Sequence, residues 1–143
     1  PQTEIGVADL IEGWATKTPN AKAIFFEDKI YTYRQFNEAA NRYALWARSI
    51  GVKKGDAVAL LMENRPEYLF AWGGLAKIGA VAALINTNQR DRALAHSLTI
   101  SQAGHVILGS EMADNYASAV DRLEKPLKVW TTGAKVQGTE DLD

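Results

Sequence analysis

Few side chains in this chain have the types and spacing that catalysis requires. Cysteine is absent, which excludes disulfides, thiolate metal sites and cysteine nucleophiles. His96 and His105 have no partner at metal-ligand spacing, so a structural or exposed position is the simpler interpretation for both. Glu63 and Glu111 fall near predicted strand ends, but no predicted strand ends in Asp. The carboxylate set of a magnesium-binding receiver domain is therefore missing.

Phosphate-binding motifs are also missing. The chain contains neither Gly-x4-Gly-Lys-Ser/Thr nor Gly-x-Gly-x-x-Gly. The segment Thr131-Thr132-Gly133-Ala134-Lys135 combines hydroxyls, glycine and lysine after a predicted strand, yet an ordinary strand-end turn is the simpler interpretation. Arg65, Arg90 and Arg92 flank strand-end loops and could meet an anion, although solvated surface arginines are the simpler interpretation.

The four tryptophans do not form a recognisable stacking platform. Trp14, Trp46, Trp72 and Trp130 fall on separate predicted elements, which favours core or interface positions. The motifs alone therefore indicate an α/β domain without an identifiable catalytic centre.

Composition limits the class of protein. The 143 residues are 47% apolar and 9% aromatic, as in a folded globular domain. Sixteen basic and 17 acidic residues leave a net charge of -1 without a basic stripe, so no nucleic-acid partner is expected. No apolar run approaches the ~20 residues of a membrane span, and residues 1–11 lack a signal-peptide pattern. These features favour a cytoplasmic protein, and both chain ends look trimmed.

The stretch from Gly55 to Arg90 organises the predicted fold. Apolar runs over residues 57–62 and 81–85 have strand length, and a helix over residues 65–78 joins them as a parallel βαβ unit. Asn64 and Glu67 have capping-box spacing, with Pro66 in the first turn. Gly79 provides the helix end.

The segments before this unit predict an amphipathic helix over residues 5–18 and a hairpin. The hairpin pairs residues 23–26 with 30–32 around the turn 27–29. Thr32 and Gln35 form a capping box for a second amphipathic helix, which ends at Gly51.

The segments after the unit predict two more strands. A polar loop over residues 86–92 leads to a helix over 91–102, with Leu94, Ala95, Leu98 and, as a further candidate, Ile100 facing inward. A strand over 105–108 follows, then a helix with Ser110 as its N-cap, and a strand over 127–130. Residues 132–143 are expected to be a loose tail or the start of a connection to further chain.

These elements predict an α/β fold with a mostly parallel sheet of about four strands and helices on both faces, preceded by a helix and a β-hairpin. Ligands of such sheets bind beyond the carboxyl ends of the strands. The corresponding loops are residues 63–65, 86–88, 109–111 and 131–133, so any site should use them.

Several segments, in order, resemble the opening of the acyl-adenylate-forming (AMP-binding) enzymes. They are Thr32-Tyr33, Gly51-Val52-Lys53-Lys54-Gly55-Asp56, Asn64-Arg65-Pro66-Glu67-Tyr68 and Lys77-Ile78-Gly79-Ala80-Val81. A further set is similar to the branch of fatty acid transport proteins and very-long-chain acyl-CoA synthetases. It consists of Ala83-Leu84-Ile85-Asn86-Thr87-Asn88-Gln89-Arg90, Ala93-Leu94-Ala95-His96-Ser97-Leu98 and Gly109-Ser110-Glu111-Met112.

The resemblance implies an enzyme that uses ATP and magnesium to convert a fatty acid to an acyl-adenylate and then transfers the acyl group to coenzyme A. Residues 1–131 would be the N-terminal α/β subdomain of its large domain, an incomplete piece of a larger fold. The family's phosphate loop, adenine contacts and catalytic lysine would lie beyond residue 143. The fragment alone is therefore expected to be inactive and to bind no cofactor, while the parent enzyme could sit peripherally at a membrane.

One weak site hypothesis follows from the resemblance. Asn86, Thr87 and Asn88 would line the coenzyme A channel of the parent enzyme, whereas the alternative is that they only close a turn. A free-standing α/β binding or interaction module is the competing interpretation of the whole chain, and reading the parent gene would distinguish the two. A fragment with uncovered apolar surface is also expected to self-associate.

Overall fold

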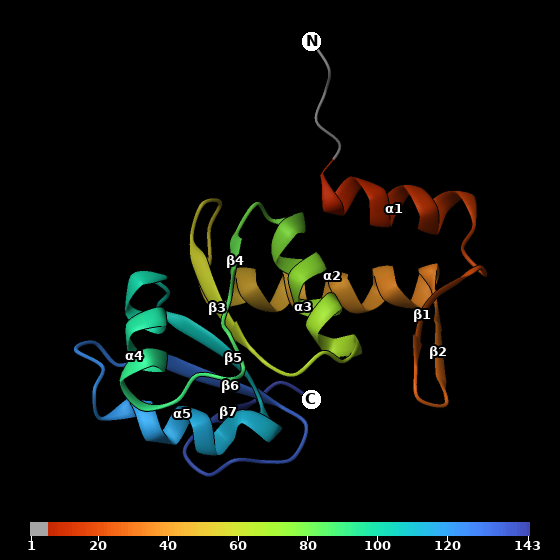
Figure 1. The fold of residues 1–143 in the computed structure, drawn as a ribbon. Coiled ribbons are helices and arrows are strands. Elements are labelled where there is room, and N and C mark those ends of the chain that lie inside the picture. Colours follow the sequence, from red (N-terminus) through yellow and green to blue (C-terminus); the bar gives the residue numbers. More distant parts are fainter. Residues whose placement is uncertain (1–5) are drawn as a thin grey trace. The chain divides into compact units, whose positions relative to one another are not determined.

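The computed structural model describes residues 6–143, which form two compact units (Figure 1). The described part of the first unit comprises residues 6–55 and Arg65–Ala80, and the second unit comprises Asp56–Asn64 and Val81–Asp143. Ile5, at the start of the first predicted helix, lies outside the described residues. The elements follow the predicted order, so the α/β fold with an N-terminal helix and a β-hairpin is confirmed.

The first unit contains three helices and the hairpin: α1 (Val7–Lys17), β1 (Lys22–Phe26), β2 (Lys29–Thr32), α2 (Tyr33–Ser49) and α3 (Pro66–Lys77). The two strands are antiparallel, and Phe26 pairs with Lys29 across a turn in which Glu27 has φ of 51°. The turn is therefore one residue shorter than predicted.

The capping box of α2 forms as predicted. The Gln35 N–H donates to Thr32 Oγ1 at 3.2 Å, and the Thr32 N–H donates to Gln35 Oε1 at 2.9 Å. These bonds satisfy two backbone donors that the first helical turn cannot pair internally. At the other end, Gly51 adopts φ of 88°, a left-handed conformation that costs glycine little.

The predicted capping box of α3 is wrong. The N-cap is Arg65, no side chain caps the helix, and Pro66 is its first residue. Proline suits this position because its fixed φ matches the helix and its missing N–H would have been unpaired there. Glu67 instead pairs with Arg65, with 3.5 Å between Arg65 Nη1 and Glu67 Oε2. The predicted helix end is confirmed, since Gly79 follows with φ of 71°.

Two adjacent glycines bring α3 close to α2. A Cβ added to Gly74 would lie 2.5 Å from the Cβ of Tyr43 and 2.6 Å from the carbonyl oxygen of Ala40. A Cβ on Gly73 would meet the tip of the Ile11 side chain of α1 at 2.9 Å. The helices pack backbone to backbone at Gly74, and any larger side chain would separate them.

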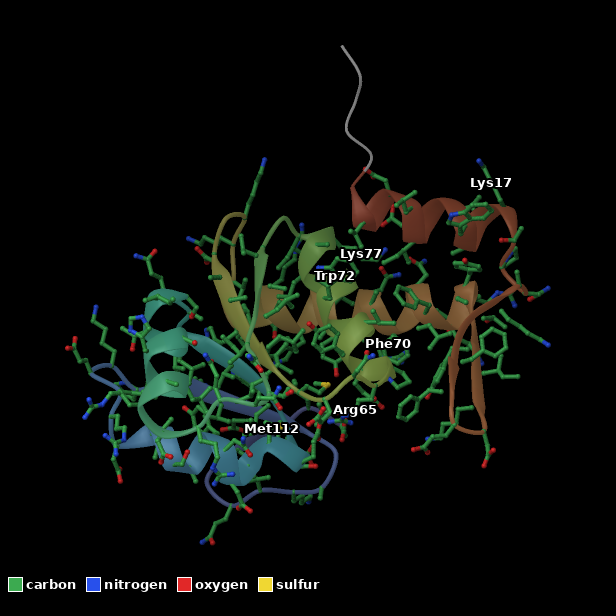
Figure 2. The ribbon with its side chains drawn as sticks, in the orientation of Figure 1. Lys17, Arg65, Phe70, Trp72, Lys77 and Met112 are labelled. Carbon is green, nitrogen blue, oxygen red and sulfur yellow. The ribbon has the colours of Figure 1, made fainter. Side chains whose placement is uncertain are left out.

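Lys77 joins the three helices of this unit through polar contacts (Figure 2). Its Nζ donates to Glu12 Oε1 on α1 at 2.8 Å and to Asn37 Oδ1 on α2 at 2.7 Å. The Lys77 side chain is only 6% exposed. Both polar partners therefore offset the cost of covering its charge.

The second unit is built on a five-stranded, all-parallel sheet. In spatial order its strands are β4 (Val81–Leu84), β3 (Ala57–Leu61), β5 (His105–Gly109), β6 (Lys128–Thr132) and β7 (Glu140–Asp141). The helices of this unit are α4 (Asp91–Ile100) and α5 (Ala113–Val120), with a short 3-10 turn η1 (Ser110–Met112) before α5.

α4 and α5 lie side by side and share one core with the sheet (Figure 1). Alternate residues of β3 and β5 contribute to this core, together with apolar residues of both helices: Ala59, Leu61, Val106, Leu108, Leu94, Ala95, Leu98, Met112, Tyr116 and Ala119. The expected inward position of Ile100 is wrong, because its side chain is 65% exposed at the last turn of α4.

The sequence predicts that residues 132–143 are a loose tail or the start of a connection to further chain, but part of this segment, Glu140–Asp141, pairs with the sheet as β7. Thr132 Oγ1 donates to Asp143 Oδ1 at 2.7 Å, and the Gly133 N–H donates to Asp143 Oδ2 at 2.6 Å. The predicted N-cap role of Ser110 is also wrong: the N-cap residue of α5 is Met112, and Ser110 Oγ accepts the N–H of Ala134 at 3.0 Å. All three bonds join residues that lie between 10 and 24 positions apart in the sequence.

The glycine contact between α2 and α3 predicts opposite effects for two matched substitutions. Gly74→Ala should lower the free energy of unfolding by about 2 kcal/mol or more, because the added methyl meets backbone atoms. Gly13→Ala, inside α1 with nothing within 4 Å of its added Cβ, should raise it by about 0.5–1 kcal/mol. Urea unfolding of the two variants measures this; equal effects would contradict the packing described here.

Candidate functional site at the carboxyl edge of the sheet

The strand-end loops meet at one edge of the second unit because all strands of its sheet are parallel. Glu111 joins two of these ends. Its Oε1 accepts the Glu63 N–H at 2.9 Å, so the carboxylate links the end of β3 to the turn after β5. The same carboxylate occupies the space that a Cβ on Gly109 would need. Glu111 is thus used in holding the loops together.

The loop after β4 contains the predicted site residues Asn86, Thr87 and Asn88. Asn86 Oδ1 accepts the Asn88 N–H at 2.8 Å, and the Asn86 carbonyl accepts the Gln89 N–H at 3.2 Å. This is the turn closure that the alternative interpretation expected. Asn88 is nevertheless exposed, and no described residue bonds its side chain or the Thr87 hydroxyl. Two polar groups therefore remain for a ligand.

Two side chains of α5, which sequence reasoning missed, hold this loop. Asn115 Nδ2 donates to the carbonyl of Gln89 at 3.1 Å and, at 3.4 Å, to that of Thr87. Ser118 Oγ accepts the Asp91 N–H at 2.9 Å. The only sequence signal was their spacing of three residues, which places them on one face of a helix.

The loop after β6 is closed by its own chain. Thr131 and Thr132 are buried, and the hydroxyl of Thr132 is bonded to Asp143. Thr131 Oγ1 lies 3.1 Å from Thr139 Oγ1 and 3.2 Å from the Glu140 carbonyl. The strand-end-turn interpretation of segment 131–135 therefore fits the structure.

The two histidines lie apart. His96 is exposed on α4. His105 is half-buried at the start of β5, where its Nδ1 accepts the indole N–H of Trp130 at 3.2 Å. Burial lowers the pKa of His105, the charge of Lys128 lowers it further, and Asp56 partly opposes both. A neutral imidazole is also what the indole donor requires.

The three candidate arginines have different surroundings within their own units. Arg65 is the N-cap residue of α3 in the first unit and pairs with Glu67. Arg90 Nη1 donates to Asn115 Oδ1 at 3.4 Å. Arg92 is exposed and borders a shallow pocket with His96 and Arg122. Only Arg90 therefore lies in the network that holds the candidate loop.

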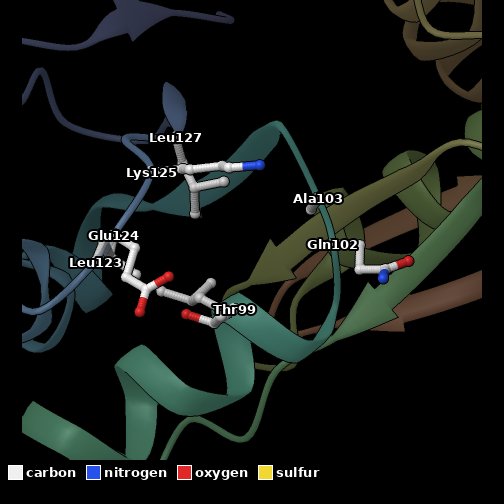
Figure 3. Close-up of a pocket in the computed structure, with 8 residues that line it drawn as sticks. Thr99, Gln102, Ala103, Leu123, Glu124, Lys125 and Leu127 are labelled. Carbon is white, nitrogen blue, oxygen red and sulfur yellow. The ribbon is translucent and has the colours of Figure 1, made fainter.

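A pocket of about 430 Å³ lies away from the carboxyl edge. Figure 3 shows Thr99 of α4 across from Leu123 and Glu124, which follow α5. Two further lining residues lie just before strands of the sheet: Ala103 is two residues before β5, and Leu127 is one residue before β6. The pocket therefore lies at the amino ends of these strands, opposite the edge where parallel sheets bind ligands.

Metal-ligating clusters and long apolar helices are absent from the part of the chain that the structure describes. Among residues 6–143, no three His, Cys, Asp or Glu side chains are grouped so that they could hold a metal ion. In the same range, no helix is both long and apolar enough to cross a membrane. What the edge provides is a polar loop after β4 that is held by hydrogen bonds from α5.

Comparison with protein families decides the assignment. The family model described as "AMP-binding enzyme" matches residues 11–142, which is most of the chain. The chain belongs to this family. The resemblance to the acyl-adenylate-forming enzymes, and to the fatty acid transport proteins among them, is thereby confirmed.

Relatives of this chain include two proteins whose names refer to long-chain fatty acids. Long-chain fatty acid transport protein 6 of Mus musculus is 33% identical over 97% of this chain, and the match covers 22% of that protein. Medium/long-chain-fatty-acid–CoA ligase FadD6 of Mycobacterium tuberculosis is 32% identical over 82% of this chain, covering 20% of the relative.

A solved structure shows the same arrangement of elements. The inhibitor-bound N-terminal domain of FACL13 from Mycobacterium tuberculosis is 32% identical to this chain, with a TM-score of 0.81. The match covers 90% of this chain and 34% of that one. The chain thus spans about a fifth of the length of the curated relatives described above.

Proposed function

We propose that this chain is the N-terminal part of a fatty-acid–CoA ligase. The observation that carries the proposal is the AMP-binding family match over residues 11–142, combined with relatives named for long-chain fatty acids and for CoA ligation. In this proposal, residues 1–131 belong to the N-terminal subdomain of the ligase's large domain. Residues 132–143 lead to the remainder.

The proposed reaction has two steps and uses ATP, magnesium and coenzyme A. A fatty acid carboxylate oxygen attacks the α-phosphorus of ATP, and pyrophosphate leaves to give an acyl-adenylate. The sulfur of coenzyme A then attacks the acyl carbon, and AMP leaves as the thioester forms. Both steps need donors or a metal aimed at the departing phosphates, which the proposal assigns to the rest of the enzyme. Such an enzyme would act in the cytoplasm, in solution or peripherally at a membrane.

The contribution of this chain would be a scaffold with one wall of the ligand-binding region. We assign that wall to Asn86, Thr87 and Asn88, as part of the coenzyme A channel. The loop lies at the carboxyl edge of a parallel sheet, where ligands of such folds bind. The Thr87 hydroxyl and the side-chain amide of Asn88 have no hydrogen-bonding partner among residues 6–143, so they are available to a polar ligand.

An activity assay tests the function. The parent enzyme, expressed from the complete gene and supplied with palmitate, ATP, magnesium and coenzyme A, should release pyrophosphate and AMP and form palmitoyl-CoA. The 143-residue chain under the same conditions should form no palmitoyl-adenylate. A parent enzyme that forms no thioester with any fatty acid would refute the ligase assignment, and acyl-adenylate formation by the chain alone would refute its scaffold role.

A substitution of Asn88 tests the proposed coenzyme A site more directly than a substitution of Asn86, whose side chain closes the turn. Asn88→Ala removes an exposed side chain and keeps the turn, because that turn uses the Asn88 backbone N–H. In the parent enzyme, it should raise the KM for coenzyme A about 3- to 10-fold, the value of one lost hydrogen bond. Exposed Asp114 on α5 gives the control Asp114→Asn. An unchanged KM in Asn88→Ala would exclude this residue from the channel.

We also propose that the chain by itself self-associates through β4. This strand pairs only with β3 among residues 6–143, and Val81 and Leu84 are 52% and 55% exposed. Leu84→Lys should therefore reduce the oligomers seen by light scattering, whereas Ile100→Lys, at a 65% exposed position on α4, should not. A strict monomer at high protein concentration would contradict this.

A further inference from the structure

We propose that Asn115 of α5 is a positioning residue for the loop after β4, and that through this loop it sets the affinity for coenzyme A. The second half of this inference rests on the function proposed above. The first half rests only on the hydrogen bonds of the second unit.

Both N–H groups and the oxygen of the Asn115 side-chain amide form hydrogen bonds. Its Nδ2 can donate two hydrogen bonds, and the carbonyls of Thr87 and Gln89 accept both, at 3.4 and 3.1 Å. Its Oδ1 accepts from Arg90 Nη1 at 3.4 Å. One half-buried side chain thus bonds three residues of a four-residue stretch and fixes the path of the chain between Thr87 and Arg90.

Ser118, one turn further along α5, holds the end of the same loop. Its hydroxyl donates to the Asn115 carbonyl at 2.6 Å and accepts the Asp91 N–H at 2.9 Å. Asp91 has φ of 49°, a left-handed conformation that non-glycine residues adopt at a cost. The contact with Ser118 stabilises this conformation at the point where the loop enters α4.

The loop has few other constraints. Its internal bonds are the Asn86 turn closure, and Gln89 Oε1 accepts from Ser97 Oγ on α4 at 2.6 Å. The preceding strand β4 is an edge strand. α5 is anchored in the core by Tyr116 and Ala119, so it provides a fixed support from which Asn115 and Ser118 act. Without Asn115, the peptide units that present Thr87 and Asn88 would lose their attachment to that support.

Asn115→Asp separates hydrogen bonding from packing. Aspartate has nearly the shape of asparagine, but its carboxylate cannot donate to the two carbonyls and repels them. If the two bonds donated by Asn115 position the loop, Asn115→Asp should release Thr87 and Gln89 as Asn115→Ala does, even though its carboxylate can still accept from Arg90. If the residue only fills space, Asn115→Asp should behave like the unmodified protein. Asp114→Asn, the neighbouring exposed position, is the control for altered charge on α5.

In the parent enzyme, both Asn115 variants should raise the KM for coenzyme A about 3- to 10-fold, as expected for lost hydrogen bonds. Pyrophosphate exchange into ATP with fatty acid and no coenzyme A should stay within about twofold of the unmodified rate, because acyl-adenylate formation does not involve coenzyme A. An unchanged KM in both variants would overturn the inference, as would an equal loss in both half-reactions.

Amide hydrogen exchange in the chain itself tests the positioning without any ligase activity. In Asn115→Asp, the amides of Gln89 and Asp91 should exchange about tenfold faster, whereas those of β5 should keep their rates. Unchanged exchange at Gln89 and Asp91 would refute the positioning role. If the parent enzyme forms no acyl-CoA, the ligase assignment and the coenzyme A half of this inference fail together, and the exchange result decides the positioning role independently.

Discussion

The burial of β3 is the constraint on which the second unit depends. Val58, Ala59, Leu60 and Leu61 have no solvent exposure, and the strand pairs in parallel with both β4 and β5. A strand buried in this way has all its backbone groups paired by its neighbours. Parallel neighbours need crossover connections. Because all the strands of this sheet run in the same direction, every strand ends at the same edge. The position of the candidate loop follows from that edge.

At the carboxyl edge of the sheet, several polar side chains are bonded to neighbouring loops. The carboxylates of Glu111 and Asp143 accept hydrogen bonds from backbone N–H groups and from a hydroxyl of neighbouring loops. The side-chain amide of Asn115 donates to carbonyls of the loop after β4. Groups used in this way position a chain and are not free to act on a substrate. This agrees with the proposal that the chain is a scaffold within an AMP-binding enzyme. Among residues 6–143, the Thr87 hydroxyl and the Asn88 side chain have no hydrogen-bonding partner, which is why the proposal assigns the ligand-binding wall to them.

Patterns among neighbouring residues predicted most helices and strands, whereas contacts between residues distant in sequence determined the C-terminal segment and the support of the candidate loop. The Thr32–Gln35 capping box, the Gly51 and Gly79 helix ends and the buried run of β3 all depend on neighbours in sequence, and all were predicted. Asn64 satisfied the same local rule, but Pro66 displaced the helix start by one residue. The return of β7 depends on Thr132 and Asp143, and the loop support on residues 26 to 28 positions apart. Periodicity carries no information about such pairs.

The most direct test of this account is hydrogen exchange of the complete parent enzyme, loaded with a non-reactive acyl-adenylate analogue and titrated with coenzyme A. The account predicts that coenzyme A slows exchange in residues 86–90 of this chain, while the segment that lines the pocket at the amino ends of β5 and β6, including Thr99 and Gln102, is unaffected. Saturation with coenzyme A without any slowing in residues 86–90 would contradict it.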